Sequence, residues 1–74
     1  MCLAIPMQIQ TMSGFNAICQ AKGVERQVSL FMLQGETLAP GDHVLVHVGY
    51  AIQKVSPEEA SSTWVLLDEI AAQM

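Results

Sequence analysis

Apolar and polar side chains alternate with a period of two residues through most of the first 55 positions, and glycines interrupt this alternation at short intervals. That period is typical of strands that bury one face. The predicted strands cover residues 5–10, 15–21, 24–32, 43–48 and 50–55. Turn signals at residues 13–16 and 22–23, a loop at 33–42 and Gly49 separate them. The pattern predicts a mainly β fold, a small OB-like barrel of about five strands.

Two residues within these strands carry further information. Pro6 cannot donate a ladder hydrogen bond, so we expect it near the start of its strand or at an edge. Arg26 interrupts the apolar face of the third predicted strand, and a bulge or register shift is expected there.

The period changes after residue 55, where a C-terminal helix is predicted over residues 56–74. Ser56 can cap the helix, Pro57 suits its first position, and Glu59 stands where a capping box needs a carboxylate. Apolar side chains then recur at helical spacing, at Ala60, Trp64, Leu67, Ala71 and Met74, with Ile70 beside them. We expect the stripe through Trp64 and Leu67 to pack on the barrel or on a partner. The chain is therefore interpreted as a single domain, 1–74, with a barrel at 1–55 and a helix at 56–74.

Charge and composition exclude several classes of protein. Apolar residues make up 51% of the 74 positions, which argues against disorder. The net charge of −4 disfavours binding to nucleic acid or to anionic membranes. No apolar run approaches the roughly 20 residues that span a bilayer. The first residues lack a basic segment, so no signal peptide and a cytoplasmic location are expected. The acids of the predicted helix (Glu58, Glu59, Asp68 and Glu69) are expected to be solvated.

The chain holds two cysteines. Cys19 lies on the apolar face of a predicted strand and is expected to be a small buried side chain. Cys2 follows the initiator methionine, whose removal would leave a terminal cysteine with its amine close to its thiol. A neighbouring ammonium favours the thiolate, which attacks electrophiles and binds soft metals such as iron, copper(I) or zinc. The alternative is an incidental terminal residue.

Two histidines are the other candidates for a site. On a strand, His43 and His47 share one face but stand about 13 Å apart, so one metal cannot readily take both. His47 is the better candidate because it lies within the strand, just before Gly49, whereas His43 is expected at the loop edge and solvated. The alternatives are a hydrogen-bonded structural histidine, or a small thiol or redox enzyme that uses Cys2 with His47.

Two segments, MCLAIP at residues 1–6 and GDHVLVHVGYAI at residues 41–52, together resemble the HypC/HybG/HupF family of [NiFe]-hydrogenase maturation chaperones. The resemblance covers the whole chain. It departs at Met7, where many members carry glycine, and this difference is interpreted as a change in partner preference.

The resemblance implies an OB-like barrel that is not an enzyme. Such proteins bind the iron–sulfur scaffold protein HypD, help to carry a transient Fe(CN)2CO unit with no tightly held cofactor, and deliver it to the hydrogenase large-subunit precursor. A HypE-type protein would join through a ternary complex. The essential terminal cysteine of the family corresponds to Cys2, and its motif histidine to His47, as a second metal ligand or a neighbour of the metal. The partner-binding residues implied are Cys2, Leu3, Ala4, Ile5, Pro6 and His47, with residues 44–48 shaping the docking surface.

Overall fold

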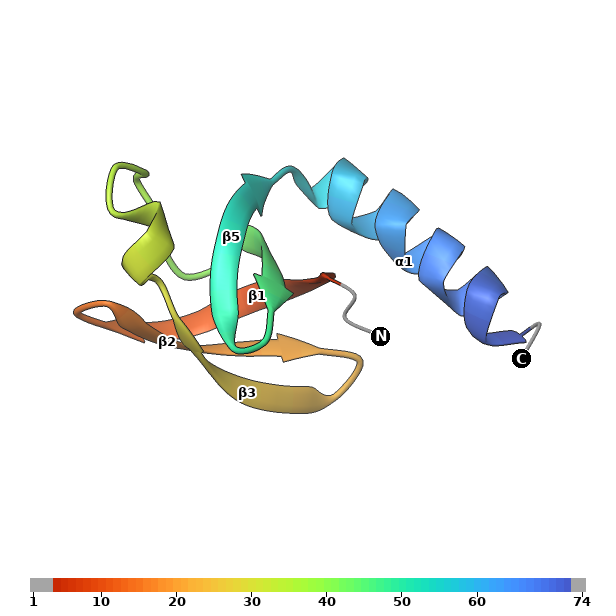
Figure 1. Ribbon diagram of the computed structural model, residues 1–74, viewed down its shortest axis with the longest axis horizontal. Coiled ribbons are helices and arrows are strands. Elements are labelled where there is room, and N and C mark those ends of the chain that lie inside the picture. Colours follow the sequence, from red (N-terminus) through yellow and green to blue (C-terminus); the bar gives the residue numbers. More distant parts are fainter. Residues whose placement is uncertain (1–3, 73–74) are drawn as a thin grey trace.

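The computed structural model describes residues 4–72 of the chain. Its strands are β1 (Ile5–Ser13), β2 (Asn16–Ala21), β3 (Val24–Ser29), β4 (His43–His47) and β5 (Tyr50–Val55); a 3-10 turn η1 (Phe31–Leu33) follows β3, and helix α1 (Pro57–Ala72) follows β5 (Figure 1).

The five strands form a closed barrel in the order β1-β2-β3-β5-β4, with β4 pairing back onto β1. All neighbours are antiparallel except β3 and β5, which are parallel and meet at Ser29 and Tyr50. The predicted mainly β fold, a barrel of five strands with a C-terminal helix, is thereby confirmed.

Along β1 and β4, side chains that point into the core alternate with side chains on the outer face of the barrel. Met7 pairs with Val44, and both side chains are at most 3% exposed. The residues between such positions, including Pro6 and Leu45, therefore lie on the outer face, because successive side chains of a strand point to opposite faces. The core comprises Met7, Ile9, Ala17, Cys19, Val28, Leu30, Leu33, Val44, Val46 and Ala51. Met7 thus belongs to the interior, and the change in partner preference inferred from it stays a prediction.

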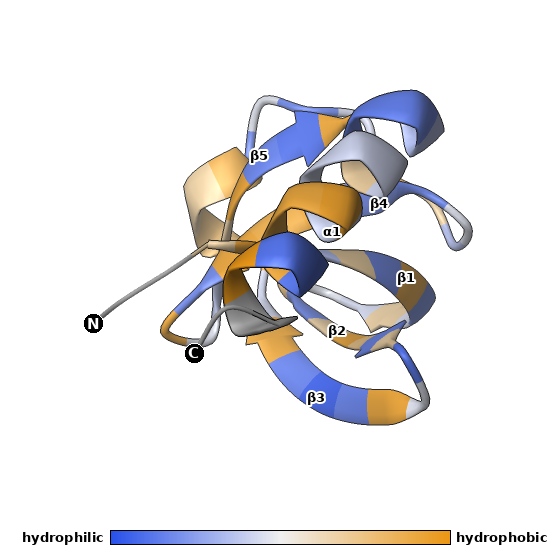
Figure 2. Ribbon diagram, turned by 90° about the vertical axis from the view of Figure 1, so that its right-hand side faces the viewer, coloured by the Kyte–Doolittle hydropathy of each residue, from blue (hydrophilic) through white to orange (hydrophobic). Residues whose placement is uncertain are grey.

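The third strand is shorter than predicted. It ends at Ser29, and Met32 belongs to η1, where the Ser29 hydroxyl oxygen accepts a hydrogen bond from the backbone N–H of Phe31 at 3.3 Å. A serine that bonds to nearby backbone offers an alternative to the ladder. No register shift occurs at Arg26, which pairs with Cys19 in an unbroken ladder. Figure 2 shows the polar middle of β3 between two apolar ends.

The register shifts fall elsewhere. One lies in β1 between Ile9 and Thr11, where the end of the long loop contributes two backbone hydrogen bonds to Ile9. Gly41 donates one of them and has a φ of +98°, which favours glycine. The second shift is between Leu45 and Val46 of β4, opposite Ile52 of β5.

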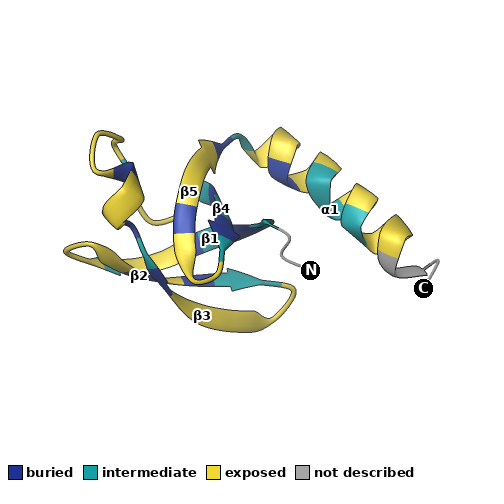
Figure 3. Ribbon diagram, viewed as in Figure 1, coloured by how far each residue is buried: buried dark blue, intermediate teal, exposed yellow. Residues whose placement is uncertain are grey.

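Helix α1 begins with the predicted capping box. The Ser56 hydroxyl accepts from the Glu59 N–H at 3.1 Å, and the Glu59 carboxylate accepts from the Ser56 N–H at 3.2 Å. Ala60 is buried, and Trp64 and Leu67 are half-buried, which confirms that this stripe packs on the barrel. The helix then leads away from the barrel, and most of its surface is exposed (Figure 3).

Among residues 4–72, no helix combines the length and the apolarity that crossing a membrane requires. The cytoplasmic location expected from the sequence stays a prediction.

Candidate functional site

The described chain starts beside the end of β4. Ile5 pairs with Val46, so the same antiparallel register, continued by one residue, places Ala4 level with His47. On the other side of β4, His47 pairs with Tyr50 of β5. Opposite residues in antiparallel strands share a face and have Cβ atoms about 5 Å apart. His47 of β4 and Tyr50 of β5 therefore form a row on the outer face of the barrel with Ala4, the residue that precedes β1.

His47 carries a buried nitrogen with no partner among the residues that the structure describes. The residue as a whole is half-buried. Its Nε2 atom is inaccessible to solvent and makes no hydrogen bond within residues 4–72. A buried polar atom without a partner costs about 1–3 kcal/mol of stability. Such an atom has a hydrogen-bonding capacity that no described residue uses.

His43 lies on the same face, at the first residue of β4, as predicted from the strand period. The structure does not bring it to His47, and it is half-buried rather than solvated. It lines a shallow cavity of about 280 Å³ beside α1, together with Pro6, Gln8 and Trp64. Residues 44–48 contribute less outer surface than expected, because Val44 and Val46 point into the core.

A tight turn follows His47. Val48 has a φ of +53° and Gly49 a φ of +81°, as a two-residue type I′ hairpin turn requires. A β-branched residue in this region is an outlier, and the conformation costs about 1–3 kcal/mol. The turn is held in place because the Gly49 carbonyl accepts a hydrogen bond from the Ser29 N–H at 2.9 Å. Val48 itself is 72% exposed.

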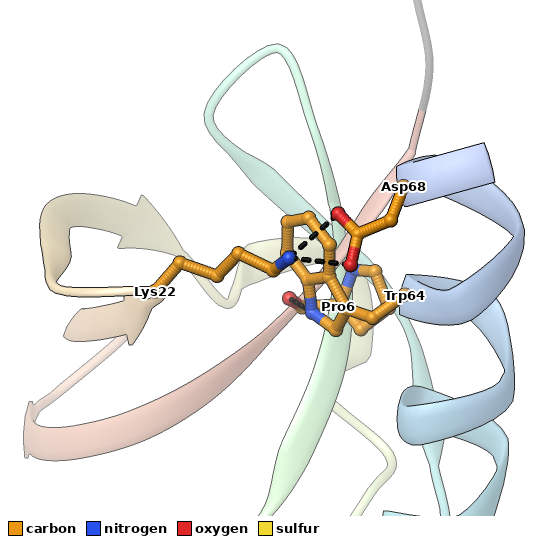
Figure 4. Close-up of polar contacts among 4 residues, drawn as sticks. All are labelled: Pro6, Lys22, Trp64 and Asp68. Atoms are coloured by element: carbon orange, nitrogen blue, oxygen red, sulfur yellow. Dashed lines mark hydrogen bonds and ion pairs between the residues drawn. The ribbon is translucent and has the colours of Figure 1, made fainter. Parts of the chain in front are cut away.

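The start of β1 is also fixed to α1. Pro6 is the second residue of its strand, as predicted, and its side chain is fully buried. Ladder pairing between β1 and β2 begins at Gln8, so the barrel leaves Pro6 without a β2 partner. The Trp64 indole N–H donates to the Pro6 carbonyl at 2.9 Å instead (Figure 4).

A lysine from the β2–β3 turn completes this contact. The Lys22 ammonium lies 2.6 Å from the Asp68 carboxylate and 4.9 Å from the centroid of the Trp64 ring (Figure 4). The helix acids Glu58, Glu59, Asp68 and Glu69 are all exposed, as expected. Asp68 forms this ion pair in addition, and Glu59 has the predicted capping role. Both partners of the ion pair are more than half exposed, so it contributes about 1 kcal/mol or less.

Cys19 lies at the centre of the core with no exposed surface, and its thiol is free. Burial raises the pKa of this thiol, because desolvation disfavours the thiolate. The expectation of a small buried side chain is confirmed, and Cys19 is unsuited to attack or to bind metal.

Cys2 and Leu3 lie outside the described residues. Within residues 4–72, no three side chains of the metal-ligating types come together. The roles predicted for Cys2, Leu3, Ala4, Ile5 and Pro6 in binding a metal or a partner thus stay predictions.

Sequence reasoning did not identify Tyr50 or the Pro6–Trp64 bond. For Tyr50 a signal exists in the sequence, because a turn at Val48–Gly49 makes His47 and Tyr50 opposite residues. The Pro6–Trp64 bond joins residues 58 positions apart and has no local signal.

The amino-acid sequence was compared with known proteins. A sequence model of the HupF/HypC family matches residues 1–67, the greater part of the chain. The chain belongs to the HupF/HypC family. A hydrogenase maturation factor HypC from Rhizobium leguminosarum bv. viciae is 42% identical over 72 residues, which cover 96% of this chain and 93% of the relative. Another, from Cupriavidus necator, is 39% identical over 71 residues, covering 95% of this chain and 77% of the relative. A third, from Helicobacter hepaticus, is 37% identical over 75 residues, covering all of this chain and 86% of the relative.

Membership of the HupF/HypC family agrees with the resemblance in the two sequence segments at residues 1–6 and 41–52. The matched residues contain the row of Ala4, His47 and Tyr50 and the turn at Val48. These relatives are named maturation factors.

Proposed function

We propose that this chain is a hydrogenase maturation chaperone that carries an Fe(CN)2CO unit between a HypD-type scaffold protein and the large-subunit precursor. The iron unit is its cargo. In this proposal the Cys2 thiolate holds the iron reversibly, and His47 supports it. The observation that carries the proposal is the buried Nε2 of His47, which has no partner within residues 4–72 and lies at the level where the described chain starts.

The position of Cys2 in the sequence suits this role. It precedes Ala4 by two residues, a span of at most about 7 Å, and Ala4 is level with His47. A thiolate is a soft ligand for low-spin iron. A cargo that must be passed on is better held by one or two protein ligands than by a closed set of four, since each further ligand would have to be released.

His47 supplies a nitrogen whose bonding capacity is unused within the described residues. Without a proton, its Nε2 can accept a hydrogen bond from a thiol or bind a metal through its lone pair. In the other tautomer it can donate a hydrogen bond to a thiolate or a cyanide nitrogen. Each of these bonds would recover the free energy that desolvation of Nε2 costs. His47 is therefore assigned to the cargo and His43 is not.

The test is coexpression with HypD, purification of the complex and infrared spectroscopy of its cyanide and carbonyl stretches. Cys2→Ala is expected to remove the signals from the chaperone, and Cys19→Ala to retain them, because Cys19 is sealed in the core. The same comparison pairs His47→Ala, expected to weaken the signals, with His43→Ala as the matched control. Undiminished signals in Cys2→Ala would refute the proposal, and catalytic turnover by the isolated chain would favour a thiol enzyme instead.

A further inference from the structure

The barrel holds the first residues of β1 on one side only. The N–H of Ile9 donates to Asp42 and its carbonyl accepts from Gly41, so the backbone groups of Ile9 face the loop that leads into β4. Successive residues of a strand direct these groups to opposite sides, so the carbonyl of Pro6 faces away from β4. No residue of β2 pairs with Pro6, and a proline has no N–H to donate. The strand is therefore open on its β2 side at this residue.

Trp64 of α1 closes this opening. Its indole N–H donates to the Pro6 carbonyl at 2.9 Å. The ring is itself held in place, because the Lys22 ammonium lies 4.9 Å from its centroid and pairs with Asp68, one helical turn further along α1 (Figure 4). Lys22 has a φ of +52°, at a turn position where asparagine is preferred. The contact with the ring gives a lysine a use at this position.

Packing of α1 on the barrel does not by itself require this hydrogen bond. Ala60 is already buried one turn before Trp64, and an aromatic ring without an N–H would fill the same space. The bond adds a fixed direction, because it sets the plane of the peptide group that follows Pro6. Ala4 precedes Pro6 by two residues, about 7 Å along the strand, and is level with His47. The bond therefore acts on the part of β1 that leads toward His47.

We infer that Trp64 is a positioning residue for the cargo: through the Pro6 carbonyl it holds the start of β1 against β4, and so keeps the Cys2 thiolate within reach of His47. The inference rests on the proposed function, which assigns the iron to these two residues. Without the bond, β4 alone holds the start of β1, which can then separate from His47 while the rest of the barrel stays folded.

The test is the rate at which the iron unit is lost. The chain is coexpressed with the scaffold protein and purified with its cargo, and the cyanide and carbonyl stretches are followed after a chelator is added. Trp64→Phe keeps an aromatic ring and removes the N–H, and we expect it to lose iron about fivefold faster, the factor that one hydrogen bond is worth. In a His47→Ala background the same change should add little, because the positioning serves His47.

The matched control is Val28→Ala, which leaves a cavity in the core, on a strand that does not pair with β1. It lowers the melting temperature without touching Pro6, and should retain iron as the wild type does. Hydrogen exchange of the cargo-free chain gives a readout that is independent of iron. Trp64→Phe should speed exchange at the amide of Ile5, which pairs with Val46 of β4, and Val28→Ala should not.

Iron loss at the wild-type rate in Trp64→Phe would overturn the inference, and so would unchanged exchange at Ile5. An equal acceleration in Val28→Ala would assign the effect to stability, and an undiminished effect in the His47→Ala background would assign it to another contact; either result overturns the inference and leaves the proposed function standing. Absence of the cyanide and carbonyl stretches from the wild-type chain would instead refute the proposed function, and the inference with it.

Discussion

The indole N–H of Trp64 donates a hydrogen bond of 2.9 Å to the carbonyl oxygen of Pro6, across 58 positions of sequence. Pro6 lies where β1 has no partner in β2, so this single bond takes the place of a ladder contact. It fixes the first half of α1 against the start of β1. The position of the helix and the start of β1 are therefore coupled.

Replacing Trp64 with phenylalanine tests this coupling. The variant keeps an aromatic ring on the barrel but leaves the half-buried Pro6 carbonyl without its donor, so we expect a loss of about 1–2 kcal/mol in the free energy of unfolding. Urea denaturation followed by circular dichroism measures it. Leu66→Ala, at an exposed position of the same helix, should change stability far less. Equal losses in the two variants would show that the hydrogen bond contributes nothing.

Lys22→Met should have a smaller and salt-dependent effect. It keeps the aliphatic stem but removes both the ion pair with Asp68 and the contact of the cation with the Trp64 ring. We expect a loss of about 1 kcal/mol or less at low ionic strength, decreasing as salt is added, because these groups are exposed and screened. Denaturation at two salt concentrations gives the comparison. A loss independent of salt would assign the effect to packing of the side chain.

His47→Leu is expected to separate stability from function. Leucine has no polar atom to desolvate, so the free energy of unfolding should rise by about 1 kcal/mol while delivery of iron to the precursor falls. The measurements are the melting temperature and the amount of mature hydrogenase in cells. A marked fall in stability would mean that Nε2 has a hydrogen-bond partner in the native chain. His43→Leu serves as the comparison on the same face.

Cys19 predicts a pH dependence at the alkaline end. Burial raises the pKa of its thiol above the ordinary value of 9.0. The folded chain then keeps a proton that the unfolded chain releases, so stability from this group is complete below about pH 9 and is lost as the pH rises toward the folded-state pKa. Urea denaturation between about pH 8 and pH 10.5, for wild type and Cys19→Ala, isolates the effect as the difference between two slopes. Parallel slopes would contradict it.

Much of the fold could be predicted from local pattern. The two-residue period identified all five strands. Glycines located their turns, because turn positions with positive φ, such as Gly23 and Gly49, favour glycine over other residues. The capping box at Ser56 set the start of the helix. The end of β3 was missed because Met32 continues the apolar period, and only the contact between Ser29 and η1 shows that the strand has stopped.

The site was less predictable for a physical reason. Which residues face each other across β1, β4 and β5 depends on register, and the register shift at Leu45 and Val46 has no signal in the sequence. Valine favours strands, so the sequence predicts that Val48 continues the strand, whereas closure of the hairpin between His47 and Tyr50 places it in a turn. Tertiary pairing overrode local preference at this position.

The half-buried indole of Trp64 belongs to the only tryptophan of the chain, and it touches the strand that leads from the N-terminal segment. Emission from this ring depends on its hydrogen bond and on nearby water, so the fluorescence of the native chain reports on events at the start of β1 without any attached dye. A partner that excludes water from the indole, or that breaks its hydrogen bond, would shift the wavelength of this emission. The packing of α1 on the barrel can thus be followed in real time.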